Sequence, residues 1–255
     1  MFRRINGGGT ARRARRGGPA GLAMASALLA LAACASAPTR DETQGRVDAA
    51  RTTLSHFTSD PEMSWFREHV GSAKAIMISP EIVQAGIIVG GSAVRRFGGA
   101  ALVIAHNRSN GGGGSRASGS GWNGPAFYRI AAASVGLQAG AQASEMVALI
   151  MTDKVLNSLM STSFKLGGDV SVAAGPVSAG TGAPITADMV VYTRSKGLYR
   201  GINLDGTVIT IDEERNRAYY GQPATPVDIL VTRSVANPYG ATLAQAASGA
   251  GAGAR

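Results

Sequence analysis

The sequence has very little cysteine and few charged residues, and both shortages limit what the protein can be. Its 255 residues contain one cysteine, Cys34, so an intramolecular disulfide is impossible and zinc or iron–sulfur centres lack their usual ligands. Charged residues make up only 16% of the chain, against about 25% in average soluble proteins. Hydrophobic residues reach 45%, which is enough for one globular core and excludes intrinsic disorder for most of the chain. We expect no metal and no other cofactor.

The positive charge is concentrated at the N-terminus. Six of the 25 basic residues, and none of the 16 acidic ones, lie within residues 1–33. The rest of the chain therefore has 19 basic against 16 acidic residues and contributes little to the formal charge of +9. A nucleic-acid-binding domain carries a basic patch or stripe of its own. The charge thus indicates targeting, and we expect no nucleic-acid partner.

The N-terminal segment has the order of parts found in an export signal. Arginines up to position 16 are followed by an apolar run over residues 20–33 that ends in small side chains, which is typical of a signal peptide. The uncharged stretch 17–39 is long enough to cross a bilayer, so a retained membrane anchor is the alternative. The sequence LAAC at residues 31–34 favours cleavage, because it resembles the bacterial lipobox, in which the chain is cut before the cysteine and the cysteine is acylated.

The lipobox implies a chain with four parts. We expect a signal peptide at 1–33, a polar tether at 34–44, a folded domain at 45–235 and a low-complexity Ala/Gly tail at 236–255 that is disordered over its last residues. The mature protein then starts at Cys34 and is held on membrane lipid by its acyl chains. Because Ala35 rather than an acid follows the cysteine, the familiar sorting pattern implies the outer membrane, on the side facing the periplasm.

Two amphipathic helices are predicted at the start of the domain, the first over about 45–57 and the second beginning near Asp60 and Pro61, with a capping side chain before a proline. Their apolar stripes consist of Val47, Ala50, Leu54 and Phe57 in the first and of Met63, Phe66 and Val70 in the second. Such helices can lie on a membrane, but their polar faces mix both charge signs. Packing against the domain's own sheet is therefore favoured.

The following sequence changes to short apolar runs separated by glycine, which is typical of strands. These runs cover residues 75–78, 87–89, 100–105, 127–135 and 146–151. A helix is predicted at 153–160 with Thr152 as its cap, and residues 107–121 form a Gly-rich loop. We expect an α+β fold: a mainly antiparallel, barrel-like or strongly curved β-sheet with N-terminal helices and one or two short helices between strands.

The clearest local pattern is a hairpin over residues 197–211. Asp205-Gly206 is the signature of a two-residue type I′ turn, and closing the hairpin there places Ile202 opposite Ile209. The acids at 212–214 then predict the start of a short helix, because carboxylates are favourable at a helix N-terminus.

No arrangement of residues favours catalysis. Ser134 lies in a segment, 132–136, that resembles a nucleophile elbow, but all three histidines precede it and more strand follows. An ordinary strand serine is the better interpretation, and we expect no enzyme. The basic residues that group within the domain are Lys165, Arg194, Lys196 and Arg200. They either solvate the end of a strand or form a site for an anionic lipid headgroup.

Several long phrases of the sequence resemble the SYLF domain family. They lie at residues 86–92, 122–150, 165–177, 192–212 and 219–221, so the resemblance covers about 72–231. It implies a non-catalytic lipid-binding domain, since eukaryotic members bind phosphoinositides and membranes and yeast relatives bind and bundle actin filaments. Bacterial members are commonly exported lipoproteins, in agreement with the lipobox.

Three departures from the family limit what the resemblance implies. Residues 93–99 do not follow the family's glycine pattern, and the loop 107–121 is an insertion. Residues 46–70 carry comparable numbers of acids and bases, unlike the basic N-terminal helix of eukaryotic members. We therefore expect a lipid ligand with an anionic headgroup, phosphoinositide-like headgroups included, and do not carry over the phosphoinositide specificity of eukaryotic members. The alternative is a protein-interaction scaffold whose protein partner the sequence does not name.

Overall fold

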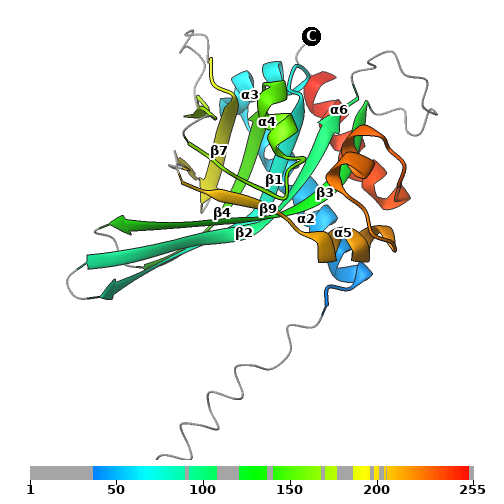
Figure 1. Ribbon diagram of the computed structural model, residues 1–255. Helices are drawn as coiled ribbons and strands as arrows, with labels where there is room; N and C mark the ends of the chain where they lie inside the picture. The colour runs from blue at the N-terminus through cyan, green and yellow to red at the C-terminus, as the bar shows by residue number, and fades with distance from the viewer. Residues whose placement is uncertain are drawn as a thin grey trace, which may run out of the picture. The chain divides into compact units, whose positions relative to one another are not determined.

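A nine-stranded, mainly antiparallel sheet is the framework of the fold (Figure 1). The computed structural model describes residues 37–89, 92–107, 121–136, 140–167, 170–176, 186–195, 198–200, 204 and 206–252. The four long strands are β1 (Ala75–Val89), β2 (Ser92–His106), β3 (Trp122–Gly136) and β4 (Gly140–Ile150). The short ones are β5 (Ser163–Lys165), β6 (Val172–Ala174), β7 (Met189–Ser195), β8 (Leu198–Arg200) and β9 (Val208–Ile211).

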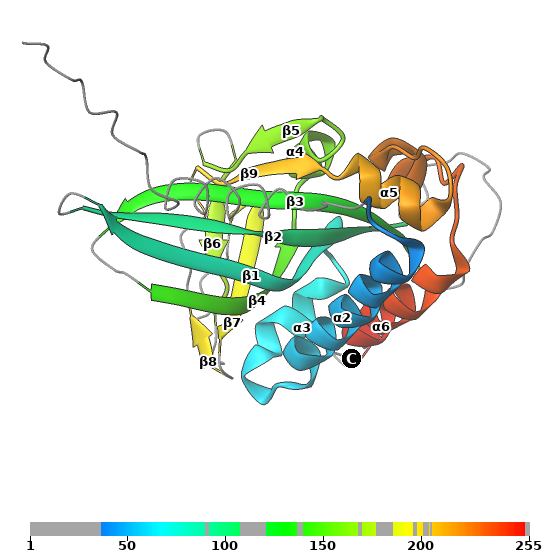
Figure 2. The same cartoon turned by 90° about the horizontal axis from the view of Figure 1, so that it is seen from below.

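The strand order is β5-β9-β3-β2-β1-β4-β7-β6, and β8 pairs with the side of β7. Only β6 and β7 run parallel among the described pairs. The sheet curls strongly, as Figure 2 shows from below. The expected α+β fold with a strongly curved antiparallel sheet is confirmed.

Helices lie against both faces of this sheet, and a hydrophobic core is buried on each face. The described helices are α2 (Arg40–Ser59), η1 (Pro61–Met63), α3 (Ser64–Val70), α4 (Asp153–Ser158), α5 (Glu213–Tyr220), η2 (Val227–Val231), η3 (Pro238–Gly240) and α6 (Ala241–Ala252). Figure 2 shows α2, α3 and α6 side by side on one face. Side chains alternate along a strand, so Ile76 of β1 packs under these helices while Met77 packs on the other face, where α4 and η2 lie.

The apolar stripes of α2 and α3 are buried in the core beneath them. Leu54, Phe57, Phe66 and Val70 have no exposed surface, and Asp60 caps the turn before α3 by accepting a hydrogen bond from the backbone of Glu62 at 2.9 Å. The prediction that these helices pack on the domain's own sheet is therefore confirmed for both.

The tether ends earlier and the first helix begins earlier than predicted. Thr39 and Glu42 form a capping box, in which the Thr39 hydroxyl accepts from the Glu42 amide at 3.2 Å and the Glu42 carboxylate accepts from the Thr39 amide at 2.8 Å. This cap starts α2 at Arg40. Residues 40–44, expected as tether, are helical because the cap lies before the hydrophobic periodicity begins.

The Ala/Gly run 244–255 was predicted to be disordered, and this is wrong for residues 244–252, which lie in α6 (Ala241–Ala252). Leu243 and Ala247 are buried in the core shared with α2 and α3. Alanine is the strongest helix former, so an Ala-rich segment needs few large side chains to fold once a neighbouring surface can bury its face.

Two predicted runs, 75–78 and 87–89, belong to the single strand β1. Pro80 lies between them and lacks the amide hydrogen that a ladder needs, and the pairing of β1 shifts register there. The Ser79 hydroxyl donates to the Ala100 carbonyl at 2.7 Å, and a Cβ on Gly99 would lie 2.4 Å from the Glu81 carbonyl oxygen. The strand thus continues through a bulge that a glycine on β2 accommodates.

The predicted hairpin is wrong in its partner. Ile209 pairs with Ile130 of β3 on one side and with Phe164 of β5 on the other, so both edges of β9 are occupied and Ile202 cannot lie opposite it. A turn does exist at the predicted place, because the Thr207 amide donates to the Leu204 carbonyl at 2.9 Å and Gly206 has φ +79°. Residues 201–203 and Asp205 lie outside the described residues.

The two short helices predicted after strands are present. α4 follows Thr152, but the Thr152 hydroxyl donates to Asp188 at 2.9 Å and makes no cap bond to the helix. α5 begins after Asp212, whose carboxylate accepts from the Arg215 amide at 3.2 Å. The expected acids at the start of this helix are thus confirmed as its cap and first turn. Of the loop 107–121, residues 108–120 lie outside the described residues.

Candidate functional site

The structure does not bring the predicted headgroup residues together as far as it describes them. These residues are Lys165, Arg194, Lys196 and Arg200. Lys165 is on β5, at one end of the strand order, whereas Arg194 is on β7 near the other. The backbone of Arg200 pairs with Thr193 across β8 and β7, and its side chain lies outside the described residues, as do Lys196 and Cys34.

Arg194 is held in an ion pair rather than offered to a ligand. Its Nη1 donates to the Glu145 carboxylate at 3.1 Å across β4 and β7. The same carboxylate lies 2.9 Å from His56 Nδ1 and accepts from the Thr53 hydroxyl at 3.2 Å, both on α2. Glu145 therefore joins α2 to the sheet, and Arg194 is part of this contact.

Ser134 does not stand on a nucleophile elbow. It pairs with Arg95 within the ladder of β2 and β3, and β3 continues to Gly136. An elbow requires a sharp turn from strand to helix at the serine. The interpretation as an ordinary strand serine agrees with this backbone.

A buried carboxylate is held by two arginines at the start of α5. Asp212 has no exposed surface, and its carboxylate accepts from Arg129 Nε at 2.8 Å and also contacts Arg215. Hydrogen bonding to Asp212 raises the pKa of the Arg129 guanidinium. Buried charges need such partners, so this cluster fixes α5 on β3.

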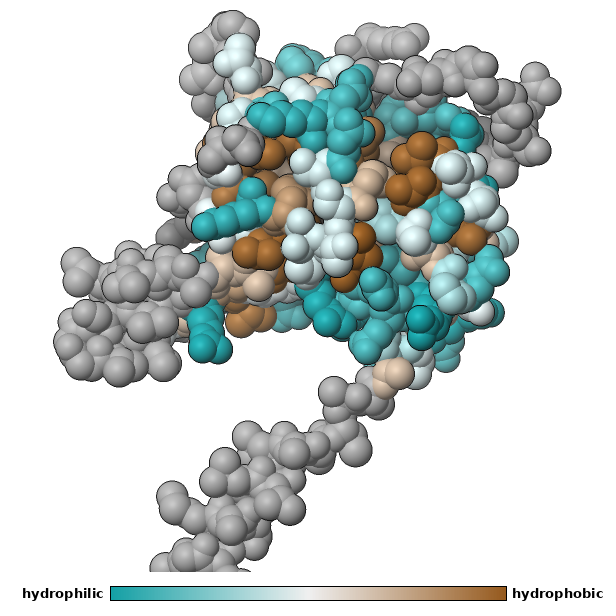
Figure 3. Space-filling view, in the orientation of Figure 1, coloured by the Kyte–Doolittle hydropathy of each residue, from teal (hydrophilic) through white to brown (hydrophobic). Residues whose placement is uncertain are grey.

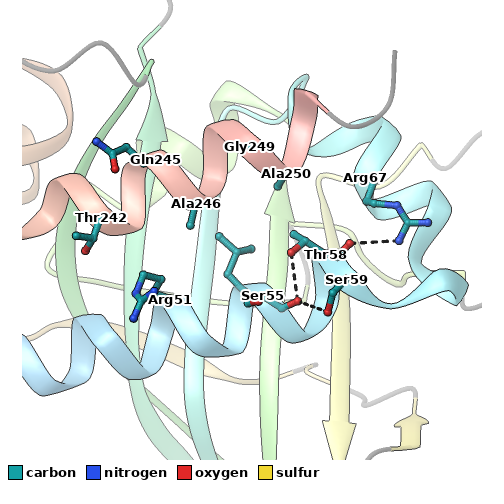
Figure 4. A pocket seen from close by; sticks show the side chains of 11 residues that line it. Arg51, Ser55, Thr58, Ser59, Arg67, Thr242, Gln245, Ala246, Gly249 and Ala250 are labelled. Atoms are coloured by element: carbon teal, nitrogen blue, oxygen red, sulfur yellow. Dashed lines mark hydrogen bonds between the residues drawn. The ribbon is translucent and has the colours of Figure 1, made fainter.

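A cleft between α2 and α6 is the best candidate for a binding site (Figure 4). It has a volume of about 600 Å³ and lies along both helices, with α3 at one end. Its lining consists of Arg51, Leu54, Ser55, Thr58, Ser59, Arg67, Thr242, Gln245, Ala246, Gly249 and Ala250. We call it the α2–α6 cleft.

The small side chains of α6 open this cleft. Ala246, Gly249 and Ala250 face α2, and a Cβ on Gly249 would meet no atom within 4 Å. With Leu54 they give the cleft an apolar floor between polar walls. An Ala/Gly segment that looks featureless as sequence thus leaves space for a ligand.

The α2–α6 cleft carries positive charge only, because its described lining has two arginines and no acid. Arg67 donates to the carbonyls of Thr58 at 3.4 Å and Pro61 at 3.3 Å and also to that of Asp60. The last carbonyls of a helix carry partial negative charge. Arg67 therefore neutralises the C-terminal end of α2, which would otherwise repel an anion.

Arg51 lies at the other end of the cleft and extends from α2 toward α6 (Figure 4). It is exposed and has no ion pair within the described chain. Asp48, one turn earlier on α2, accepts a hydrogen bond from the Tyr239 hydroxyl, which raises the pKa of Tyr239. The nearest carboxylate on α2 is thus already engaged by another partner.

The remaining polar side chains of the cleft divide into two groups. The hydroxyls of Thr58 and Ser59 donate to the Ser55 carbonyl at 3.2 and 2.7 Å, and that of Thr242 donates to the Tyr239 carbonyl at 3.1 Å. The Ser55 hydroxyl and the Gln245 amide make no such bond in the described chain. Ser55 lies one turn after Arg51 on α2, so an anion near Arg51 can receive hydrogen bonds from the Arg51 guanidinium and the Ser55 hydroxyl.

The chemistry of the α2–α6 cleft is that of binding. Its described lining has no histidine, cysteine or carboxylate that could act as base, nucleophile or metal ligand. Across the described residues, no three His, Cys, Asp or Glu side chains gather into a metal-binding group. None of the described helices is long and apolar enough to span a membrane.

The exposed surface gives no stronger candidate on the face seen in Figure 3. Apolar side chains appear there in patches that hydrophilic side chains interrupt. The large apolar side chains exposed in the described chain are Val83, Leu198, Val208, Val227 and Val231, and they come from four different elements. Apolar residues scattered in this way are normal on a protein surface.

The sequence could not reveal this cleft, because five of its eleven lining residues come from the low-complexity tail at 236–255. Arg51 was visible only as one polar residue on an amphipathic helix. The one available signal was that the helices at 47–70 offered a second place for a headgroup.

A family model described as "Ysc84: Las17-binding protein actin regulator" matches residues 131–250. Among curated proteins, LAS seventeen-binding protein 3 of Saccharomyces cerevisiae is 32% identical over 119 residues, which cover 44% of this chain and 26% of that protein. Human SH3 domain-containing YSC84-like protein 1 is 28% identical over 114 residues, which cover 43% of this chain and 33% of that protein.

The matched region thus spans about a quarter to a third of these relatives' length. It begins within β3 and includes α6, whereas α2 lies before it. The family description names a Las17-binding actin regulator, and the yeast relative is named as a LAS seventeen-binding protein. Residues 131–250 of this chain are thus similar to the Ysc84 (SYLF) domain family, in agreement with the resemblance that the sequence shows.

Proposed function

We propose that this protein is an exported, outer-membrane lipoprotein facing the periplasm, anchored through Cys34, whose SYLF-family domain binds anionic lipid headgroups without catalysing a reaction. The observation that carries the lipid-binding part is the α2–α6 cleft, with exposed Arg51 at one end and no acid in its described lining. The anchoring part rests on the sequence LAAC at residues 31–34, after an apolar run and a positive N-terminus.

A headgroup phosphate suits the Arg51 end of the cleft. A guanidinium presents a planar fork of donors that matches phosphate oxygens, and the Ser55 hydroxyl adds a neutral donor on the same helix. The apolar floor of Leu54, Ala246 and Ala250 keeps the site partly dry, which strengthens the attraction between opposite charges. The geometry therefore supports the capture of one phosphate group.

Binding of the chain from residue 35 onward to vesicles tests this function without the anchor. We expect flotation with vesicles containing anionic phosphatidylglycerol and little with neutral phosphatidylcholine vesicles. Arg51→Gln should weaken the binding about fivefold, since a basic residue near an anionic surface contributes about 1 kcal/mol. Arg217→Gln is the matched control, because Arg217 is an exposed arginine on α5 outside the cleft lining.

The second candidate is a protein-interaction scaffold. The names of the relatives favour it, since they describe a Las17-binding protein and an actin regulator. If the chain floats with neither kind of vesicle but pellets with filamentous actin, the scaffold function is supported and the headgroup site is not. Equal flotation with phosphatidylglycerol and phosphatidylcholine vesicles also argues against a site that binds an anionic headgroup.

A further inference from the structure

A second cavity of about 270 Å³ lies away from the α2–α6 cleft. It is enclosed by the start of β3, the end of α5, η2, the segment 233–237 and the first residues of η3 and α6. Its walls include Trp122, Tyr220, Ile229, Val235 and Ala244. We call it the η2–α6 pocket.

The walls of the η2–α6 pocket are mostly apolar, and the polar groups of Tyr220 and Asn237 in them are already hydrogen-bonded. Trp122 and Ile229 are buried, with 5% and 2% of their surface exposed. The Tyr220 hydroxyl donates to the Pro125 carbonyl at 2.9 Å, and burial raises its pKa well above the ordinary value. This side chain therefore stays a neutral phenol and presents its ring. The Asn237 amide likewise donates to the Tyr219 carbonyl at 2.7 Å.

One charged side chain, Arg233, stands among the described residues that line the pocket. It has no ion pair in the described part of the chain. Its backbone has φ +57°, and no other described non-glycine residue has a positive φ. This conformation is unfavourable for a residue with a Cβ, and residues held in it cluster at functional sites.

The segment before Arg233 is fixed by hydrogen bonds that do not involve its side chain. The Asp228 carboxylate accepts from the Thr225 amide at 3.0 Å, from the Thr225 hydroxyl at 2.6 Å and from the Ser234 hydroxyl at 3.2 Å. The Ser234 amide donates to the Asp228 carbonyl at 3.0 Å. Asp228, the acid closest to Arg233 in sequence, thus stabilises the turn through its carboxylate. The Arg233 guanidinium is therefore available to an anion from outside the chain.

We propose that the η2–α6 pocket binds a small carboxylic acid with an apolar body, whose carboxylate pairs with Arg233. The apolar part lies against Trp122, Tyr220 and Ile229. Ligand pockets are commonly about 300–1,000 Å³, so this cavity suits a short-chain acid and is too small for a diacyl lipid. The inference goes beyond the proposed headgroup function and depends on a different arginine and different elements.

Octanoate binding to the full chain carrying Cys34→Ser tests the proposal. Trp65→Phe makes Trp122 the remaining tryptophan, so its fluorescence reports on the pocket. We expect a saturable change with octanoate and about tenfold weaker binding of octanol, which lacks the charge. No saturable change with octanoate, or equal affinities for the acid and the alcohol, would overturn the proposal.

Arg233→Asn separates binding from folding, because asparagine tolerates a positive φ better than most residues. We expect this variant to melt at the same or a higher temperature and to lose the tenfold preference for octanoate over octanol. Arg51→Gln should leave octanoate binding unchanged, and Arg233→Asn should leave vesicle binding unchanged. A variant Arg233→Asn that keeps the wild-type preference for the acid contradicts the proposal, whatever the outcome of the vesicle experiments.

Discussion

At the scale of single residues, the arginines that pair within the domain stabilise the fold, whereas Arg51 has no ion pair in the described chain and can bind a ligand. Arg194 pairs with Glu145, and Arg129 pairs with buried Asp212. Arg67 satisfies carbonyls at the end of α2. Arg51 differs, because it is exposed in a cleft without a carboxylate. The grouping of basic residues along the sequence therefore does not locate the site, since it cannot show which charges are already paired.

Gly206 tests the turn before β9 at the same scale. With φ +79° it lies in the left-handed region, and an added Cβ would make only an ordinary 3.7 Å contact with Lys165. The cost of a side chain is therefore one of backbone conformation. Gly206→Val should lower the free energy of unfolding by about 1–2 kcal/mol, and Gly206→Asn by clearly less. Urea unfolding measures the stability of both variants. Equal stability of the wild type, Gly206→Val and Gly206→Asn would show that position 206 does not need a left-handed backbone.

At the scale of elements, α6 is the largest departure from what the sequence predicts. The N-terminal helices α2 and α3 were predictable because large apolar residues such as Leu54 and Phe66 mark their buried faces. In α6 a single large residue, Leu243, does so, and Ala247 and Ala250 give almost no hydrophobic period. Burial of this helix depends on the surface that α2 and α3 provide, which lies about two hundred positions away in sequence.

Leu243→Ala tests whether α6 packs as described. Leu243 has no exposed surface and belongs to the core under α2 and α3. Removing a fully buried leucine side chain typically costs about 2–5 kcal/mol, so we expect a loss in that range by urea unfolding. Gln245→Ala on the exposed side of α6 is the control and should change stability by less than about 0.5 kcal/mol. A silent Leu243→Ala would instead indicate the disordered tail that the sequence predicts.

Strand pairing shows the same limit of local patterns. The dipeptide Asp205-Gly206 correctly marks a turn, but it cannot report that β3 and β5 occupy both edges of β9. The runs 75–78 and 87–89 were predicted as separate strands, whereas a bulge opposite Gly99 lets β1 continue past Pro80. In both cases the deciding partner comes from a distant part of the chain. Side-chain alternation and turn residues therefore predict where a strand lies in the sequence better than they predict which strands pair with it.

At the scale of the whole molecule, the proposed function joins a lipid anchor near the N-terminus to a domain that binds at the membrane surface. The anchor predicts that Cys34→Ser releases the protein from membranes into the soluble fraction. Each buried CH₂ of an acyl chain contributes about 0.8 kcal/mol, so several chains hold far more firmly than one headgroup contact. Fractionation measures the release. Mass spectrometry should find a lipid-modified Cys34 as the first residue, and an unmodified N-terminus elsewhere would contradict the anchor.

The salt dependence of vesicle binding shows whether Arg51 in the α2–α6 cleft binds an anionic headgroup. Residues 35–255 with Arg51, and the same chain with Arg51→Gln, are titrated with phosphatidylglycerol vesicles at ionic strengths of about 0.01 M and about 1 M, where the Debye length is about 30 Å and about 3 Å. The account predicts about a fivefold difference in Kd at low salt that nearly disappears at high salt. If the two proteins bind equally at low salt while the domain itself still binds, the α2–α6 cleft is not the headgroup site.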